Sequence, residues 1–323
     1  MSTQYLRKSS LLIGSDDKGL DVSQLRFRFQ VRRGDIQTPN TADIRVYNLS
    51  PDTAKKIENE FTRVVLQAGY QDNIGTIFDG TIKQVRQGRE SQTDTYVDIT
   101  AADGDEAYNY SVTAISLAAG QTSPRSQAEI FIRDMARHNV KQGFLPSTLS
   151  SNPLPRGKAI YGQTRDALRR LSHNTDTSWS IQDGEVVMIP NSAYIPEDSV
   201  VVVTSETGMI GLPEQAANGI KIRILINPMV RIGRIIQIDN ASVQRLRYST
   251  NINAQGQRDY LQQSVKLDAD GYYYVMSIDY SGDTRGNPWY ADLTCLAADA
   301  TLVPAGMIGR VPIDQSAIKA VKI

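Results

Sequence analysis

Apolar and polar residues alternate most regularly between residues 204 and 239. Isoleucine occupies every second position from residue 220 to residue 226, and the positions between are mostly polar. Because successive side chains of a strand point to opposite faces, this alternation predicts a strand with one apolar and one largely polar face. Asn227-Pro228 ends the run, since proline has no N–H to donate to a sheet, and a second alternating run begins after Gly233. The stretch therefore predicts two strands separated by a tight reversal.

The first hundred residues show the same alternation in several short runs. Residues 24–31 predict a half-buried strand, because an apolar set alternates with a polar set: Leu25, Phe27, Phe29 and Val31 against Arg26, Arg28 and Gln30. Ser50-Pro51 predicts the start of one helix, with Ser50 as its N-cap. Further strands are expected at residues 43–47, 63–68, 76–85 and 93–101. We assign residues 1–102 to an N-terminal β-barrel domain with one short helix.

The middle of the chain, residues 103–198, mixes helical and strand patterns. Ser126 and Glu129 have the spacing of a capping box ahead of an apolar helical stripe, and Thr164 is expected to cap a second helix. Asp183-Gly184 predicts a hairpin turn between two short apolar runs. Residues 141–158 hold three prolines and no periodicity, which predicts a loop. We expect a mixed α+β domain here.

The last region, residues 199–323, is nearly all strand and turn. Strands are expected at residues 200–204, 220–226, 235–238, 245–248, 272–280 and 290–297, and residues 251–270 are expected to form a polar loop. The predicted fold class is therefore mainly β with α+β parts: two β-barrel domains flanking a mixed middle domain. No internal repeat is obvious at the residue level.

Composition narrows the function classes. Lys plus Arg and Asp plus Glu both number 35, so the formal net charge is zero, whereas a protein that grips a nucleic-acid backbone is usually basic. The single cysteine, Cys295, allows no intrachain disulfide and fits synthesis in a reducing cytoplasm. No apolar stretch reaches the ~20 residues that a membrane-spanning helix needs, so we expect no membrane insertion.

Candidate catalytic and metal-binding residues are sparse. His138 and His173 each end a predicted helix, where a positive charge is favourable without catalysis, and they form no pair with the lone cysteine. The glycines of residues 75–80 lack the lysine of a phosphate-binding loop, and Asp268-Ala-Asp270-Gly271 departs from the spacing of a calcium loop. We therefore expect no catalytic residue, no cofactor and no metal site.

Two charged clusters leave alternatives open. Asp103, Asp105 and Glu106 could supply the two carboxylates of a glycosidase, so a peptidoglycan hydrolase is an alternative; ordinary solvated charges are the simpler interpretation. Arg26, Arg28 and Arg32 share the strand face opposite the phenylalanines. This set is a candidate interface for an acidic partner or for DNA, against a solvated face or intersubunit ion pairs. A nucleic-acid-binding barrel is disfavoured, because its aromatic residues would point away from the arginines.

Three sequence blocks carry a family resemblance. The first is TADIRVYNLSPDTAKKI near the start of the chain. The second is the series T-G-x-I-G-x-P, N-G-I-K-I, L-I-N-P and I-I-Q-I-D between residues 204 and 239, and the third is GYYYVMSIDYSGDTRGNPWYADLTCLA, residues 271–297. In their order and span these blocks resemble the baseplate hub proteins of contractile-tailed bacteriophages, the tail hub or late control protein D-like family.

This resemblance implies a structural protein of the virion tail, made in the host bacterial cytoplasm. Hubs of this family form a homotrimer whose two tail-tube-like barrels per subunit build a pseudo-sixfold ring. The ring joins the sixfold tail tube to the threefold central spike and leaves a channel for the tape measure protein and for DNA in transit. Implied partners are the tail tube or distal tube protein, the spike, the tape measure protein and other baseplate proteins. A hub of a phage-derived contractile particle is the related alternative.

Overall fold

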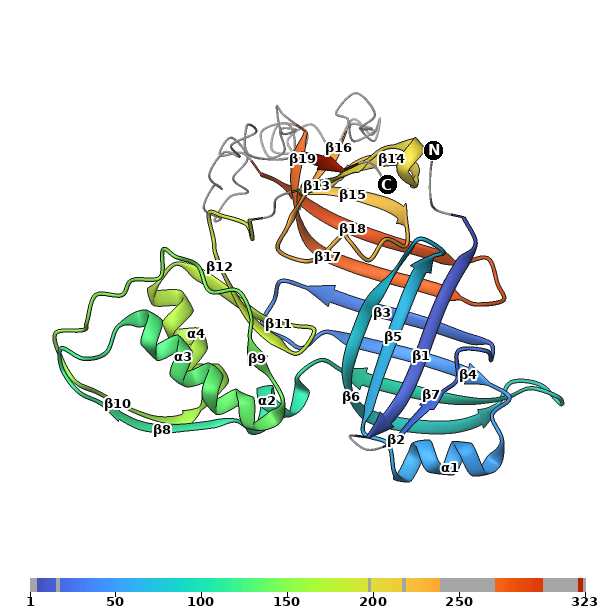
Figure 1. Cartoon of the computed structure of the whole chain (residues 1–323), viewed down its shortest axis with the longest axis horizontal. Helices are drawn as coiled ribbons and strands as arrows, with labels where there is room; N and C mark the ends of the chain where they lie inside the picture. The colour runs from blue at the N-terminus through green and yellow to red at the C-terminus, as the bar shows by residue number, and fades with distance from the viewer. Residues whose placement is uncertain are drawn as a thin grey trace, which may run out of the picture.

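The computed structural model describes residues 5–15, 18–196, 199–216, 219–238, 271–298 and 319–321. Within these residues the protein is mostly β, with one 14-stranded sheet and two small sheets (Figure 1). The first region contributes β1 (Arg7–Ser15), β2 (Lys18–Asp21), β3 (Phe27–Gly34), β4 (Thr41–Tyr47), α1 (Pro51–Asn59), β5 (Arg63–Tyr70), β6 (Asn73–Arg89) and β7 (Thr95–Ala102).

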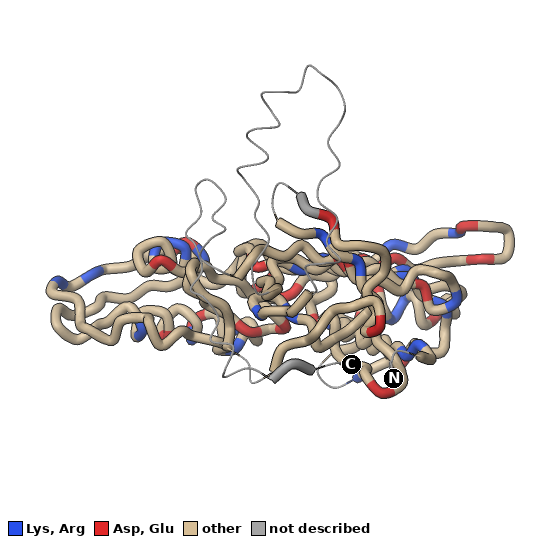
Figure 2. The backbone as a smooth tube through the Cα atoms, turned by 90° about the horizontal axis from the view of Figure 1, so that it is seen from above, with Lys and Arg blue, Asp and Glu red and all other residues tan. Residues whose placement is uncertain are grey.

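The middle and last regions supply the remaining elements. The middle region comprises α2 (Asp105–Tyr110), β8 (Val112–Leu117), α3 (Pro124–Met135), η1 (Ala136–His138), β9 (Lys141–Gln142), β10 (Lys158–Gln163), α4 (Thr164–Asn174), β11 (Thr177–Gln182) and β12 (Glu185–Pro190). The last region comprises β13 (Ser199–Val203), η2 (Ser205–Thr207), β14 (Met209–Ala216), β15 (Gly219–Leu225), β16 (Ile235–Ile238), β17 (Tyr272–Asp283), β18 (Trp289–Ala297) and β19 (Lys319–Val321). The middle region and the β6–β7 hairpin lie at opposite ends of the long axis (Figure 2).

The strand predictions are largely confirmed. In β3 the phenylalanines and Val31 are buried while Arg28 and Arg32 are exposed, as the alternation predicts. The isoleucine run forms β15 and the following run forms β16, although these two strands pair with other strands and not with each other. The expected strand at residues 245–248, the polar loop at 251–270 and the Asp268–Asp270 turn lie outside the described residues.

Eight strands of the large sheet form one continuous segment in the order β14-β15-β18-β17-β3-β4-β7-β6, which we call the eight-strand segment. Its two halves have the same connectivity. In each half, the two strands of one hairpin come first, in chain order, and the two strands of a second hairpin follow in reversed order. One half is β14-β15 then β18-β17, and the other is β3-β4 then β7-β6. The fold therefore contains an internal repeat that the residues themselves do not display.

The two halves join where β17 pairs with β3, in an antiparallel register from Ser277↔Gly34 to Asp283↔Arg28. A single hydrophobic core lies beneath both, since Phe27, Val64, Ile222 and Tyr280 belong to one buried cluster. The predicted pair of separate barrels is not confirmed: the described strands form one large antiparallel sheet without closing into a barrel. The reason is that β17, which pairs with β18 on one side, pairs from Ser277 to Asp283 on its other side with β3 of the first region, so the strands of the two regions continue into one sheet.

The middle region has its own core, in which Phe131, Leu168 and Trp179 are buried between helices and small sheets. The predicted hairpin is confirmed as β11–β12, with Asp183 and Gly184 at φ of 54° and 77°. In the expected loop, residues 141–142 and 158 belong to β9 and β10.

Both predicted helix caps in this region are wrong by a few residues. The N-cap of α3 is Ser123, whose side chain accepts from the Ser126 backbone N–H, so Ser126 is the reciprocal partner and not the cap. Thr164 is the first residue of α4, and Gln163 precedes it as an N-cap without a side-chain hydrogen bond. The Thr164 hydroxyl instead bonds Ser111 and Thr113 in the interior, at 2.9 and 3.0 Å.

Candidate assembly interface

The outward face of the eight-strand segment is polar across both halves. Strand register places Asp283, Arg28, Arg45, Asp98 and Arg86 in one row that crosses from β17 to β6. A second row runs through Arg223, Asp292, Asp279 and Arg32, from β15 to β3. Two shallow hollows lie on this face, one lined by residues of β14, β15, β17 and β18 and one by residues of β3, β4, β6 and β7.

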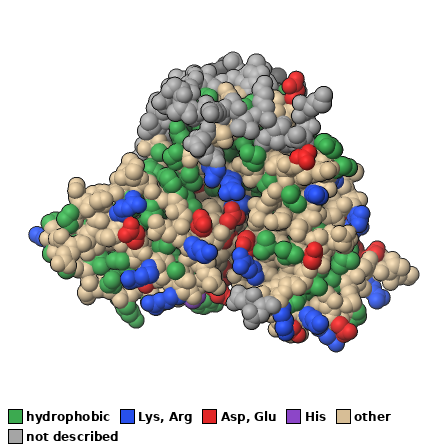
Figure 3. Space-filling view, in the orientation of Figure 1, with side chains coloured by type: hydrophobic (Ala, Val, Ile, Leu, Met, Phe, Trp, Pro, Cys, Tyr) green, Lys and Arg blue, Asp and Glu red, His purple; other side chains and the backbone are tan. Residues whose placement is uncertain are grey.

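Opposite charges on this face are paired across neighbouring strands. Arg45 contacts Asp98 at 2.7 Å and lies over the Tyr96 ring, 3.9 Å from its centroid. Arg223 contacts Asp292 at 2.7 Å. Cross-strand pairs of opposite charge stabilise a sheet modestly and leave little net field. On the opposite face, which Figure 3 shows, acidic and basic side chains also lie side by side near the centre, without a separate patch of either sign.

The three predicted interface arginines lie beside the joint between the halves. Arg26 and Arg28 both bind the Asp283 carboxylate, at 2.8 and 2.9 Å, and both guanidinium groups lie over the Tyr47 ring. Their side chains remain 39% and 46% exposed. Arg32 is exposed and faces Asp279 across the strand pair. Arg26 and Arg28 therefore hold the joint within the chain, and a role for any of the three between chains stays a prediction.

Asp283 is the acceptor at the centre of this cluster. Burial acts to raise its pKa, but hydrogen bonds from Arg26, from the Arg285 backbone N–H and from Arg28 outweigh burial and lower the pKa well below its usual range. The carboxylate is thus ionised wherever the protein is folded at ordinary pH.

The turn between β17 and β18 is fixed by close contacts. Asp283 accepts from the Arg285 N–H at 2.9 Å, as expected of turn chemistry. Neither Gly282 nor Gly286 is required for backbone conformation, because neither has a positive φ. They are required for space instead: a Cβ on Gly282 would lie 2.3 Å from the Phe29 ring, and one on Gly286 would lie 2.6 Å from Asp283 Oδ2.

Arg7 of β1 also holds this turn, by donating to the Gly286 and Asn287 carbonyls at 2.7 and 2.9 Å. Its guanidinium lies 5.6 Å from the centroid of the buried Trp289 ring. No periodicity near Arg7 indicates this contact, since its partners are about 280 positions away in the chain.

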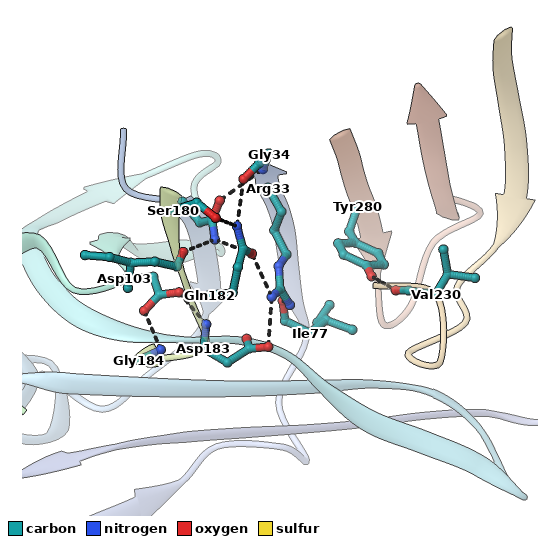
Figure 4. A network of polar contacts seen from close by, with 12 residues as sticks. Arg33, Gly34, Ile77, Asp103, Ser180, Gln182, Asp183, Gly184, Val230 and Tyr280 are labelled. Carbon is teal, nitrogen blue, oxygen red and sulfur yellow. Dashed lines mark hydrogen bonds and ion pairs between the residues drawn. The ribbon is translucent and has the colours of Figure 1, made fainter. Parts of the chain in front are cut away.

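A buried polar network attaches the middle region to the sheet (Figure 4). Arg33, at the end of β3, donates to the Ile77 carbonyl at 3.1 Å, to Gln182 at 3.2 Å and to Asp183 at 2.8 Å. Asn40 adds hydrogen bonds to the Ile181 carbonyl and to Gln182, both at 3.0 Å. A single buried arginine thus ties the β11–β12 hairpin to β3 and β6, which fixes the middle region against the sheet.

Asp103 completes the network from the other side. Its carboxylate accepts from the backbone N–H groups of Asp183 and Gly184, at 2.7 and 2.8 Å. Burial and the neighbouring Asp183 carboxylate raise its pKa to about 6, although both N–H groups and Arg33 favour the charged form. The interpretation of Asp103 as an ordinary solvated charge is therefore wrong: the side chain is buried and structural.

The other predicted carboxylates are separately engaged or exposed. Asp105 binds Lys83 at 2.8 Å, and Glu106 is exposed. Asp103 and Asp105 thus contact different partners in structural roles. His138 and His173 lie at helix ends, in η1 and in the last turn of α4, as predicted.

The described residues contain no group of three or more His, Cys, Asp or Glu side chains that could hold a metal ion. No helix among them is both long enough and apolar enough to span a membrane.

Sequence reasoning missed the inward-pointing members of these clusters. Arg33, Asn40 and Gln182 are the clearest cases. One signal was present: Arg33 follows Phe27, Phe29 and Val31 at the spacing of the buried face, so the alternation itself places a charge inside.

Several solved structures share this fold. The 43 kDa tail protein of prophage MuSo2 from Shewanella oneidensis aligns over 90% of this chain and 98% of its own, with 7% identity and a TM-score of 0.57. A tail protein from Neisseria meningitidis aligns over 90% and 96%, with 11% identity and a TM-score of 0.55. An E. coli component of the type VI secretion system aligns over 89% and 76%, with 13% identity and a TM-score of 0.54.

Comparison with curated protein sequences gives no significant match. A family model, however, matches residues 13–243, which include the β3–β4 and β6–β7 hairpins, the buried network around Arg33 and the β14–β15 hairpin. The matched region covers well over half of the chain, and its fold is that of phage tail proteins. The chain therefore belongs to the baseplate hub gp41 family, a family of structural proteins of the phage tail.

Proposed function

We propose that this protein is the trimeric hub of a tail baseplate, a ring that adapts the sixfold tail tube to the threefold central spike. The observation that carries this proposal is the internal repeat. Each chain has two four-strand units of identical connectivity, joined side by side in one sheet. Three chains would therefore present six equivalent units to the tube while keeping threefold symmetry toward the spike.

In this arrangement the polar face of the eight-strand segment lines a central channel. The cross-strand pairs Arg28–Asp283, Arg45–Asp98 and Arg223–Asp292 compensate charge along that face. A compensated surface neither retains a polyanion through counterion release nor repels it strongly, which suits passage of the tape measure protein and then DNA. The tail tube or distal tube protein, the spike and other baseplate proteins would contact the two ends of the ring.

The direct test is the mass of the purified protein by light scattering over a range of concentrations, alone and with its spike protein. A stable trimer, or a trimer that forms when spike is added, is the expected result. A chain that remains monomeric in the presence of both spike and tube proteins would contradict the proposal, and assays of cell-wall hydrolysis would then test the hydrolase alternative.

A hub in a phage-derived contractile particle is the second candidate. The observation that favours it is the fold shared with the E. coli component of the type VI secretion system. Electron microscopy of particles released by the producing cell, labelled with an antibody to this chain, separates the two: labelled tails attached to DNA-filled heads indicate a phage, and headless tails indicate a derived particle.

A further inference from the structure

The eight-strand segment has an open strand edge at each end. At one end, β14 pairs with β15 on one side, and no strand among the described residues covers its other side. At the other end, β6 changes partners: up to Thr81 it pairs with β5, whereas from Gln84 to Arg89 it pairs with β7 alone. Figure 1 shows these edges far apart, with β14 at the top and the β6–β7 hairpin beside α1 at the bottom.

The internal repeat makes these two edges equivalent to the strands of the central joint. Overlaying one unit on the other matches β14 with β3, because each opens its unit, and matches β17 with β6, because each closes it. The β17–β3 pairing within the chain is thus a template for a contact between β6 of one copy and β14 of the next. The repeat generates that contact whenever copies follow one another around a ring.

Charge at the two open edges is complementary. On β6, Arg86 and Arg89 are exposed and have no acidic partner within ion-pair distance in the described part of the chain; Arg86 donates only to Gln84, at 2.9 Å. On and next to β14, Glu214 and Glu206 are exposed and equally lack a basic partner within that distance among the described residues. The polarity is reversed relative to the central joint, where β3 carries the arginines and β17 the aspartates.

The edge of β14 is shaped to limit its pairing. A register shift between Ile210 and Glu214 interrupts its ladder, Gly211 has a φ of +73°, and Pro213 has no N–H to donate. These features discourage indiscriminate strand addition at an exposed edge. Specificity at this edge therefore rests more on side-chain charge than on backbone hydrogen bonds.

We propose that the outer edge of β6 in one copy, with Arg86 and Arg89, contacts β14 of the next copy through Glu214 and Glu206, in a head-to-tail contact that closes the ring. This inference rests on the proposed homotrimer and names the surface that forms it. Because the contact is heterologous, it joins two different surfaces, and each copy uses both edges. The β6 edge of one copy binds the β14 edge of the next, and neither edge binds a second copy of itself.

Charge reversal at each edge tests the contact. Arg86→Glu and Glu214→Lys, made singly, are each expected to raise the dissociation constant of the wild-type trimer by about tenfold or more, since close charge pairs at interfaces couple strongly. The double variant carries both reversals on one chain and is expected to restore assembly. Restoration separates the proposed contact from local damage, because the two positions lie at opposite ends of the eight-strand segment and cannot repair each other within one chain.

Matched controls are Arg170→Glu and Glu185→Lys, at exposed positions in the middle region. They change charge equally and should leave the dissociation constant within about twofold, as surface charges away from an interface do. Oxidative cross-linking of Gln84→Cys with Leu212→Cys provides an independent readout, since both side chains are exposed and Cys295 is buried. Covalent oligomers are expected from the double cysteine variant and not from either single one.

The possible outcomes separate this inference from the proposed function. A wild-type trimer whose stability neither reversal changes, and which the cysteine pair does not cross-link, overturns the edge contact and leaves the hub proposal standing. A wild-type chain that stays monomeric with its spike and tube partners overturns the hub proposal, and the contact fails with it.

Discussion

At the residue scale, Gly282 and Phe29 fit closely against each other at the joint between the two halves. The Phe29 ring packs edge-on against Trp289, with centroids 5.5 Å apart, and the outer end of the ring lies close to Gly282. Both rings are buried in the core shared by the two halves. The glycine is therefore required by space at the joint and not by backbone conformation.

Gly282→Ala should destabilise the protein by about 1–3 kcal/mol, the usual cost of forcing an extra methyl group into a packed core. Gly19→Ala is the matched control, because no heavy atom lies within 4 Å of the added Cβ and the residue is also in a strand. Denaturant unfolding of the two variants and the wild type measures the difference. Equal stability of all three would show that Phe29 moves aside without cost.

Asp103 predicts a pH dependence of stability opposite in sign to that of Asp283, because folding raises the pKa of Asp103 and lowers that of Asp283. Its pKa of about 6 in the folded protein lies above the ~3.9 of an unfolded aspartate, so between these values the folded state binds more protons. Stability from this group is therefore fully present below pH ~4 and is lost as pH rises through about 6. By linkage the loss is about 3 kcal/mol at most.

Unfolding measured at several pH values between about 4 and 7 checks this prediction. Asp103→Asn should flatten the fall in stability across that range, whereas Asp72→Asn, at an exposed turn, should follow the wild type. An Asp103→Asn profile parallel to that of the wild type would place the titrating group elsewhere.

At the element scale, Arg7 connects the first strand to the β17–β18 turn. Arg7→Ala removes two hydrogen bonds to turn carbonyls and the contact with Trp289. The loss of ~1 kcal/mol, typical of such hydrogen bonds, should speed amide exchange of residues 283–289 about fivefold. Lys8→Ala, the exposed neighbour, should leave that exchange unchanged, and an equal effect of both variants would indicate a general loosening of β1.

Helix caps show where neighbouring residues are enough to predict the start of a helix and where they are not. Ser50 caps α1 as predicted, because the cap, the proline and the apolar positions are contiguous in the chain. In α3 two serines compete for the same role, and the chosen cap, Ser123, precedes the proline that fits only the first turn. The Thr164 hydroxyl instead bonds Thr113 in β8 and Ser111 just before β8, and no pattern of neighbouring residues indicates these contacts.

At the scale of the whole molecule, assembly through charged edges predicts a dependence on salt. Raising ionic strength from about 0.05 M to 0.5 M shortens the Debye length severalfold and should weaken the trimer, chiefly by slowing association. A variant with Arg86→Gln and Glu214→Gln should lose most of this dependence. Light scattering at both ionic strengths gives the comparison, and equal salt dependence in the two proteins would mean that other charges steer assembly.

The sequence alone determined most of the strands and the helices α1, α3 and α4, which strand faces are polar, where the β11–β12 hairpin turns, and to which family the chain is similar, but it did not indicate β1, β2 or α2. These features are local, because alternation and turn chemistry are properties of neighbouring residues. Only the tertiary structure decided which strands pair, that two regions share one sheet and core, and that Arg33 and Asp103 are buried. Arg26 and Asp283 are 257 positions apart. Their contact depends on the pairing of β17 with β3, which no run of adjacent residues encodes.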